Sequence, residues 1–176
     1  MTATEYGNRQ EQNGLPLQFG TWQRYWIGLI RVLVGWWFLE SGLRQSVTLF
    51  NAEGWLTTGT ANAPFWVRGV FLWIADSPEL LALVNLGIPL VEAMIGLALI
   101  IGLLTKLAAF GGASLMFFFY FGNAGWQTGF VNADLMGLLL FLTLIVFNAG
   151  RVWSLDRYIE NTAFVESHPR LRYILG

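Results

Sequence analysis

LIRVLVGWWFLESGLR, residues 29–44, is an apolar run that nevertheless carries three charged residues, the first of them Arg31. At 100° per residue, Gly28, Gly35 and Gly42 fall on one stripe of a helix, and Arg31 lies within about 60° of it. Small residues let another helix approach closely, so this stripe should face neighbouring helices. The pattern therefore predicts a membrane span over residues 25–43 with Arg31 turned inward.

The other two charges of this run are Glu40 and Arg44. Glu40 lies about 180° from Arg31, so it cannot pair with Arg31 along the helix. It precedes Arg44 by one turn, in the order that favours an i,i+4 ion pair. We interpret Glu40 as an interface anchor rather than as a catalytic acid.

The composition indicates a membrane protein: 55% of the 176 residues are hydrophobic and 12% are charged. A soluble domain usually has about twice that charged fraction. The net charge of −1 gives no electrostatic case for nucleic acid binding. The sequence has no cysteine, and its one histidine, His168, lies in a polar tail. We therefore expect neither haem nor a metal site built from thiolates or histidines inside the membrane.

Further apolar segments at residues 80–104, 107–121 and 133–147 complete a predicted set of four spans. The expected fold is all-α, an integral membrane four-helix bundle over residues 22–158. We expect a flexible segment over residues 1–21, without a cleavable signal peptide, and a polar tail over residues 159–176. The long first loop, residues 45–79, contains the apolar stretch PFWVRGVFLWIA (64–75), which is too short to cross and predicts an interfacial or re-entrant helix.

The distribution of basic residues predicts the orientation. By the positive-inside rule, the cell membrane holds this multi-pass chain with both termini in the cytoplasm. The basic residues expected on the cytoplasmic side are Arg9, Arg24, Lys106, Arg151, Arg157, Arg170 and Arg172, against Arg44 and Arg68 outside. Trp22, Trp26 and Trp153 would mark the inner interface, and Trp55, Trp66, Trp73 and Trp126 the outer one.

The second span carries polar residues on one face. Asn85, Pro89, Glu92 and Gly96 lie within about 60° of arc, and Pro89 frees the carbonyl of Asn85. An unpaired charge inside the membrane is costly, so Glu92 should be paired or protonated, and Arg31 is the nearest cation. Two interpretations remain open for this pair: polar contacts that hold two helices together, or a site that binds a polar head group or relays protons.

The third and fourth spans meet at FFFYFGNAGW (117–126), which includes Tyr120, and GFVNADLMG (129–137), which includes Asp134. Such aromatic clusters serve packing more often than ring binding. Asp134 could line an outer vestibule, but we favour a helix cap at the start of the fourth span. At the start of the second span, Ser77 suits the N-cap position, Pro78 the first helical position and Glu79 the first turn.

Three motifs in order resemble the DoxX family of small four-span membrane proteins, and especially its DoxD-like branch. The first is an arginine, a glycine four residues on and a G-x-K/R turn, here Arg31, Gly35 and 42–44. The second, E-x3-G-x-L-x3-G followed by T-K/R, matches Glu92, Gly96, Gly102, Thr105 and Lys106, with the leucine displaced by one place. The third, G-x-G/R-x-S-L-D, resembles residues 150–156.

The resemblance implies the small membrane subunit of a thiosulfate:quinone oxidoreductase, which would pass electrons from a small reductant to quinone within the bundle. Without thiols or haem ligands, the chain would need a partner subunit to oxidise sulfur. We expect Glu92 and Arg31 to be the catalytic residues, with a ligand-binding set of Asn85, Gly35, Gly96, Tyr120 and Asp134.

Two other functions remain open: a non-enzymatic membrane scaffold or assembly factor that docks a partner protein, and a small transporter with its broken helix at Pro89. The expected contacts are membrane lipid, a partner subunit or further copies of the chain.

Overall fold

The computed structural model describes residues 20–124 and 129–159, and these residues form helices and loops without a β-strand. The predicted all-α class is therefore confirmed for the described part of the chain. The long helices are α2 (Thr21–Val47), α4 (Pro78–Ile101), α5 (Thr105–Gly122) and α6 (Ala133–Val146). Shorter elements are η1 (Trp55–Gly59), α3 (Phe65–Asp76), η2 (Ala149–Arg151) and α7 (Asp156–Ile159). Trp126, His168 and our predictions for residues 1–19 and 160–176 lie outside the described residues.

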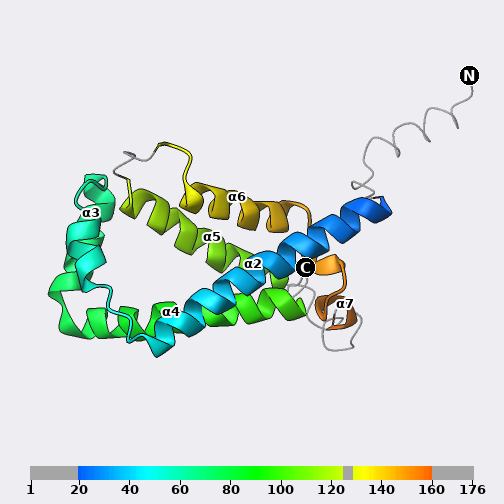
Figure 1. The fold of residues 1–176 in the computed structure, drawn as a ribbon, viewed down its shortest axis with the longest axis horizontal. Coiled ribbons are helices and arrows are strands. Elements are labelled where there is room, and N and C mark those ends of the chain that lie inside the picture. The colour runs from blue at the N-terminus through cyan, green and yellow to red at the C-terminus, as the bar shows by residue number, and fades with distance from the viewer. Residues whose placement is uncertain (1–19, 125–128, 160–176) are drawn as a thin grey trace, which may run out of the picture.

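The long helices pack mainly as two pairs, α2 with α4 and α5 with α6, and α4 also contacts α5. Figure 1 shows the pairs diverging toward the end that α3 occupies, where α4 begins and α5 ends. At the opposite end, the turn after α6 lies beside the first half of α2. The molecule therefore has one end where the helices converge and one end where α3 bridges the two pairs.

The α2–α4 crossing depends on the glycine stripe that the sequence predicts. A Cβ atom on Gly42 would lie 2.5 Å from the carbonyl oxygen of Pro89 and 2.5 Å from the amide nitrogen of Ala93. A Cβ atom on Gly35 would lie 2.9 Å from the carbonyl oxygen of Gly96. Backbone atoms cannot move aside as a side chain can, so this close approach requires glycine. The prediction that the stripe faces another helix is confirmed for Gly35 and Gly42, whereas Gly28 faces Val152 and Trp153 in the turn after η2.

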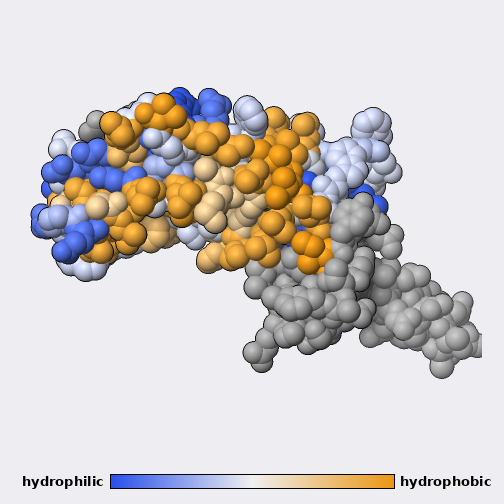
Figure 2. Space-filling model, turned by 90° about the horizontal axis from the view of Figure 1, so that it is seen from below, coloured by the Kyte–Doolittle hydropathy of each residue, from blue (hydrophilic) through white to orange (hydrophobic). Residues whose placement is uncertain are grey.

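Two of the described helices, α2 and α4, are long and apolar enough to cross a membrane, whereas α6 is a shorter apolar helix of 14 residues. The face seen in Figure 2 has apolar residues over a broad middle zone and hydrophilic residues toward the α3 end. The exposed apolar side chains include Leu29 and Leu33 of α2 and Leu86 and Leu90 of α4. These features are consistent with a membrane protein.

The apolar stretch of the first loop forms helix α3, as the sequence predicts. Ser77 occupies the N-cap position of α4, with Pro78 in the first turn and Glu79 beside it, although the Ser77 side chain makes no capping hydrogen bond. Val67 and Phe71 of α3 are buried, whereas Phe65 and Trp73 are exposed. Helix α3 is therefore amphipathic, with its buried face packed against η1, α4 and α5.

Candidate functional site

A cavity of about 330 Å³ lies in the half of the molecule toward α3. Its apolar lining consists of five aromatic residues and two aliphatic ones: Trp37, Phe38, Phe50, Trp55, Phe119, Ile88 and Met116. Its polar lining consists of Ser41, Gln45, Glu92, Asn123 and Asp134. Ligand sites typically combine mostly apolar walls with a few converging polar groups, so this cavity is the candidate functional site.

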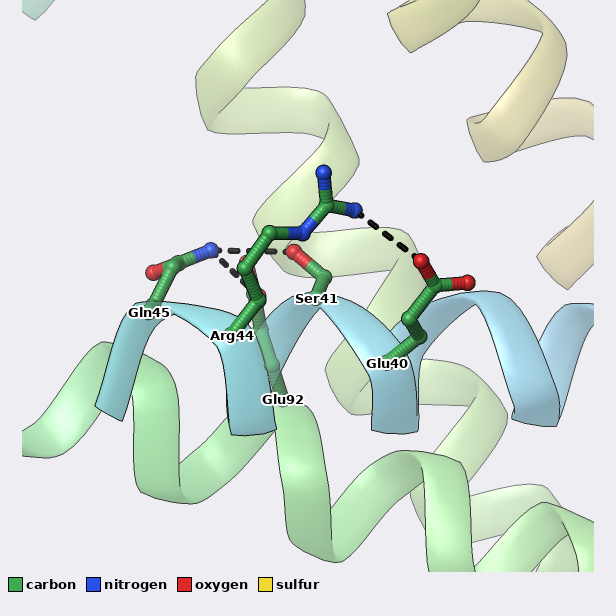
Figure 3. A network of polar contacts seen from close by, with 5 residues as sticks. All are labelled: Glu40, Ser41, Arg44, Gln45 and Glu92. Carbon is green, nitrogen blue, oxygen red and sulfur yellow. Dashed lines mark hydrogen bonds and ion pairs between the residues drawn. The ribbon is translucent and has the colours of Figure 1, made fainter. Parts of the chain in front are cut away.

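Glu92 is the buried acid of the cavity, with 3% of its surface exposed. Gln45 donates a hydrogen bond from Nε2 to Glu92 Oε2 (2.8 Å) and another to Ser41 Oγ (2.9 Å). The Ser41 hydroxyl group also lies next to the Glu92 carboxyl group. Figure 3 shows Ser41 and Gln45 of α2 meeting Glu92 of α4. Among the described residues, the carboxyl group thus has two neutral polar neighbours, Gln45 and Ser41, and no cationic partner.

A second polar cluster lines the cavity where α5 ends and α6 begins. Asn123 donates from Nδ2 to Asp134 Oδ2 (2.8 Å) and accepts at Oδ1 from Trp55 Nε1 (2.8 Å). The expectation that Asp134 caps α6 is wrong, because Asn132 is the N-cap residue and accepts from the Leu135 amide (3.0 Å). Asp134 lies in the first turn and takes the other position that we considered, in the wall of a cavity.

The predicted Arg31–Glu92 pair does not form. Arg31 points inward as expected, with 1% of its surface exposed, but it lies in the first half of α2, against the turn after α6. Its guanidinium donates three hydrogen bonds, all to carbonyl oxygens after α6: Ala149 (3.0 Å), Val152 (2.7 Å) and Trp153 (2.8 Å). Glu92 bonds instead to Gln45, fourteen residues further along α2, which is about 20 Å at 1.5 Å per residue. Tilt and side-chain length cannot close that offset.

The carboxylate near Arg31 is Asp156, which has no exposed surface and whose charge acts on the guanidinium. Asp156 accepts hydrogen bonds from the amides of Leu104 (2.7 Å) and Thr105 (2.9 Å) at the start of α5. This is capping by a residue distant in the chain. Arg31 and Asp156 therefore tie α2, α5 and the turn after α6 together.

The other predicted ligand-binding residues lie outside the cavity lining. Asn85 accepts from the Ala52 amide (2.8 Å) and holds the first loop. Tyr120 is 4% exposed and donates to the carbonyl oxygen of Phe130 (3.2 Å). Gly35 and Gly96 form the helix crossing described above. The predicted Glu40–Arg44 ion pair is confirmed, with a distance of 3.4 Å between two exposed side chains (Figure 3).

Sequence reasoning missed Ser41, Gln45, Trp37, Trp55 and Asn123 as cavity residues. One signal was available, because Ser41 and Gln45 are four residues apart and so share a helix face. Ser41 directly follows Glu40 in the sequence, and Gln45 directly follows Arg44. We had interpreted the Glu40–Arg44 pair as an anchor at the membrane interface, so we did not consider this segment as part of a site. No comparable spacing connects Trp55 to Asn123, since the fold alone brings them together.

The cavity fits the ring of a quinone. Its volume is at the lower end of the range of about 300–1,000 Å³ for ligand pockets, which suits one ring better than a ring with its tail. Aromatic walls suit a flat ring, and the buried carboxyl group of Glu92 can exchange a proton with a ring oxygen. The described residues contain no group of three or more His, Cys, Asp or Glu side chains that could hold a metal ion.

The described residues form a helical fold that is consistent with a membrane protein, and its cavity has two acidic residues and aromatic walls. The sequence profile of the family described as the TQO small subunit DoxD matches residues 26–171, and the chain belongs to this family. The resemblance seen in the motifs is therefore confirmed. No solved structure matches the chain.

Proposed function

We propose that this chain is the small membrane subunit of a quinone-linked oxidoreductase of the thiosulfate:quinone oxidoreductase type, and that its cavity binds the quinone ring. The family description supports the enzyme class, since TQO denotes that oxidoreductase. The observation that carries the proposal is Glu92, a buried acid that has no cationic partner in the described part of the chain and lies in a cavity with aromatic walls. Such a group suits proton exchange with a bound ring.

Each part of the cavity has a role in the proposal. Quinone, when bound, supplies the two-electron acceptor. Glu92 would hold or deliver a proton at one ring oxygen, while Gln45, itself hydrogen-bonded to Ser41, fixes the carboxyl group by its hydrogen bond. Trp37 and Phe119 would flank the ring, and the apolar tail would leave toward lipid. Arg31 acts in this proposal as a structural residue at the other end of the molecule.

The charge of the cavity supports a division of work between subunits. Among the described residues that line it, two are acidic and none is basic. A sulfur oxyanion such as thiosulfate would meet Glu92 and Asp134 without a compensating cation, which is unfavourable in a low-dielectric site. We therefore assign oxidation of the sulfur compound to a partner subunit, as the words "small subunit" in the family description suggest.

The proposed arrangement in the membrane is four spans, α2, α4, α5 and α6, with both termini in the cytoplasm. Arg24, Lys106 and Arg151 lie toward the converging end of the helices, which supports that end as the cytoplasmic one. In this orientation, the cavity lies in the outer half of the membrane. Helix α3 would then rest at the outer interface with Phe65 and Trp73 toward lipid.

The test is thiosulfate-dependent quinone reduction in membranes that contain this chain and its partner subunit. Glu92→Gln keeps the size of the side chain but removes the acid, so turnover should fall at least about 100-fold, the lower limit of general acid–base catalysis. The matched control is Glu40→Gln, an exposed acid on α2 that should leave turnover unchanged. Equal turnover in wild type and Glu92→Gln would remove the proposal.

A further inference from the structure

The hydrogen-bond donors of the cavity walls are almost all committed to partners in the same walls. Gln45 Nε2 donates to both Glu92 and Ser41, and the Ser41 hydroxyl group lies next to the Glu92 carboxyl group. Trp55 Nε1 donates to Asn123 Oδ1, and Asn123 Nδ2 in turn donates to Asp134 Oδ2. The donor hydrogens without a partner in the walls include the second N–H of Asn123 and the indole N–H of Trp37, both on exposed residues. Around the buried Glu92, therefore, the walls have little to offer to a ligand that only accepts hydrogen bonds.

Acceptors, by contrast, remain in excess. An ionised carboxylate can accept about four hydrogen bonds, and Glu92 and Asp134 use only part of that capacity within the walls. A quinone presents two carbonyl oxygens, which are acceptors, whereas the corresponding quinol presents two hydroxyl groups, which are donors. An ionised Glu92 can therefore accept a hydrogen bond from a quinol hydroxyl group. It offers no donor to the carbonyl oxygens of the quinone, which are acceptors themselves. A protonated Glu92 has an O–H group and matches the quinone.

We infer that Glu92 sets the redox selectivity of the cavity: ionised, it makes the cavity prefer quinol over quinone, and its protonation reverses or abolishes that preference. This inference rests on the proposed function, because it takes the ligand to be a quinone ring. A hydrogen bond to a charged group contributes enough for at least about a tenfold difference in affinity. Tenfold tighter binding of the reduced form raises the potential of the bound two-electron couple by about 30 mV. The site would thereby help to draw electrons from a weak reductant.

The groups that could otherwise cause a pH-dependent preference are few. On α2, Glu40 and Arg44 are exposed, and their opposite charges compensate each other in an ion pair. On α6, Asp134 faces the same cavity. The cavity residues contributed by α5 and η1, which are Met116, Phe119 and Trp55, have no group that titrates near neutral pH. Asp134→Asn therefore distinguishes the effect of Glu92 from that of the second acid.

The experiment measures the affinity of the purified full chain for a short-chain benzoquinone and for its hydroquinone, by anaerobic equilibrium dialysis between pH 5 and 8. Wild type should bind the hydroquinone at least about tenfold tighter at the high end, and this ratio should fall toward one as pH decreases. Glu92→Gln should show a small ratio that does not change with pH. Asp134→Asn and the exposed-site control Glu40→Gln should both keep the pH-dependent change of wild type.

Two results would overturn the inference while leaving the proposed function intact: quinone binding as tight as hydroquinone binding at pH 8, or a pH-dependent ratio that persists in Glu92→Gln. Binding of neither form to wild type would overturn the inference and the proposed function together. A loss of folding in Glu92→Gln would not imitate the predicted result, because the variant must still bind both forms to show a constant ratio.

Discussion

The contacts of Arg31 give a prediction that separates the observed arrangement from the one that the sequence suggests. The structure couples Arg31 to Asp156 at the converging end, whereas Glu92 belongs to the cavity. Two double-mutant cycles test this difference. One combines Arg31→Met with Asp156→Asn, and the other combines Arg31→Met with Glu92→Gln. Each substitution keeps the approximate size of the side chain and removes its charge.

The magnitudes follow from the buried contacts. Arg31 loses three hydrogen bonds of 2.7–3.0 Å, and its removal takes away a positive charge near the buried Asp156. Removing one partner of a buried charge pair costs about 3–5 kcal/mol, and we expect this for each of the two single variants of the first cycle. Neighbouring charges in one network couple by about 1–3 kcal/mol. For Arg31 and Glu92, which lie about 20 Å apart along the helices, the coupling should be within about 0.5 kcal/mol of zero.

The assay is reversible unfolding in mixed detergent micelles, followed by tryptophan fluorescence, with the free energy of unfolding extrapolated to one reference condition for all variants. Additive costs in the Arg31/Asp156 cycle would refute the reasoning, as would a coupling above about 1 kcal/mol between Arg31 and Glu92. The exposed substitution Glu40→Gln serves as a control and should change the free energy of unfolding by less than about 1 kcal/mol.

Two further stability predictions use the same unfolding assay, each with a matched control. Gly42→Ala places a Cβ atom against the backbone of α4 and should lower the free energy of unfolding by about 1–3 kcal/mol. The control Gly87→Ala, whose Cβ atom would have nothing within 4 Å, should be neutral or stabilising by up to about 1 kcal/mol. Equal effects of the two substitutions would contradict the close helix crossing. Asn132→Ala removes the side-chain cap of α6 and should lower the free energy of unfolding by about 1 kcal/mol. Ser77→Ala should cost only about a few tenths of a kcal/mol, because the Ser77 side chain makes no capping hydrogen bond. The reverse order would show that the cap of α6 is misassigned.

The sequence predicts the parts of this fold that depend on local periodicity. The spacing of Gly35 and Gly42 indicates which face of α2 meets another helix, and the spacing of Glu40 and Arg44 predicts their ion pair. The apolar stretch at 64–75 predicts α3. These features follow from the helical repeat alone, so they can be predicted without knowledge of the tertiary structure.

The site is harder to predict because its contacts depend on depth and on backbone atoms. Helical periodicity gives the direction in which Arg31 points but not the level at which α2 crosses α4, so a charge-matching argument assigns it to Glu92. Its actual partners are the backbone carbonyl oxygens of Ala149, Val152 and Trp153. Every residue has such a carbonyl group, so the residue types do not indicate which ones bind Arg31. Similarly, Asn132 and Asp134 are both good capping residues, and the extended backbone at Asn132 decides between them.

Photo-crosslinking with an azido-substituted quinone, followed by peptide mapping of the full chain, tests directly whether the cavity binds quinone. If quinone binds in this cavity, the label should attach to cavity segments, above all residues 37–45 of α2 and 116–123 of α5, and unmodified quinol should displace it. Labelling at the converging end around Arg31, or labelling spread over lipid-facing residues without displacement, would contradict a quinone site in this cavity.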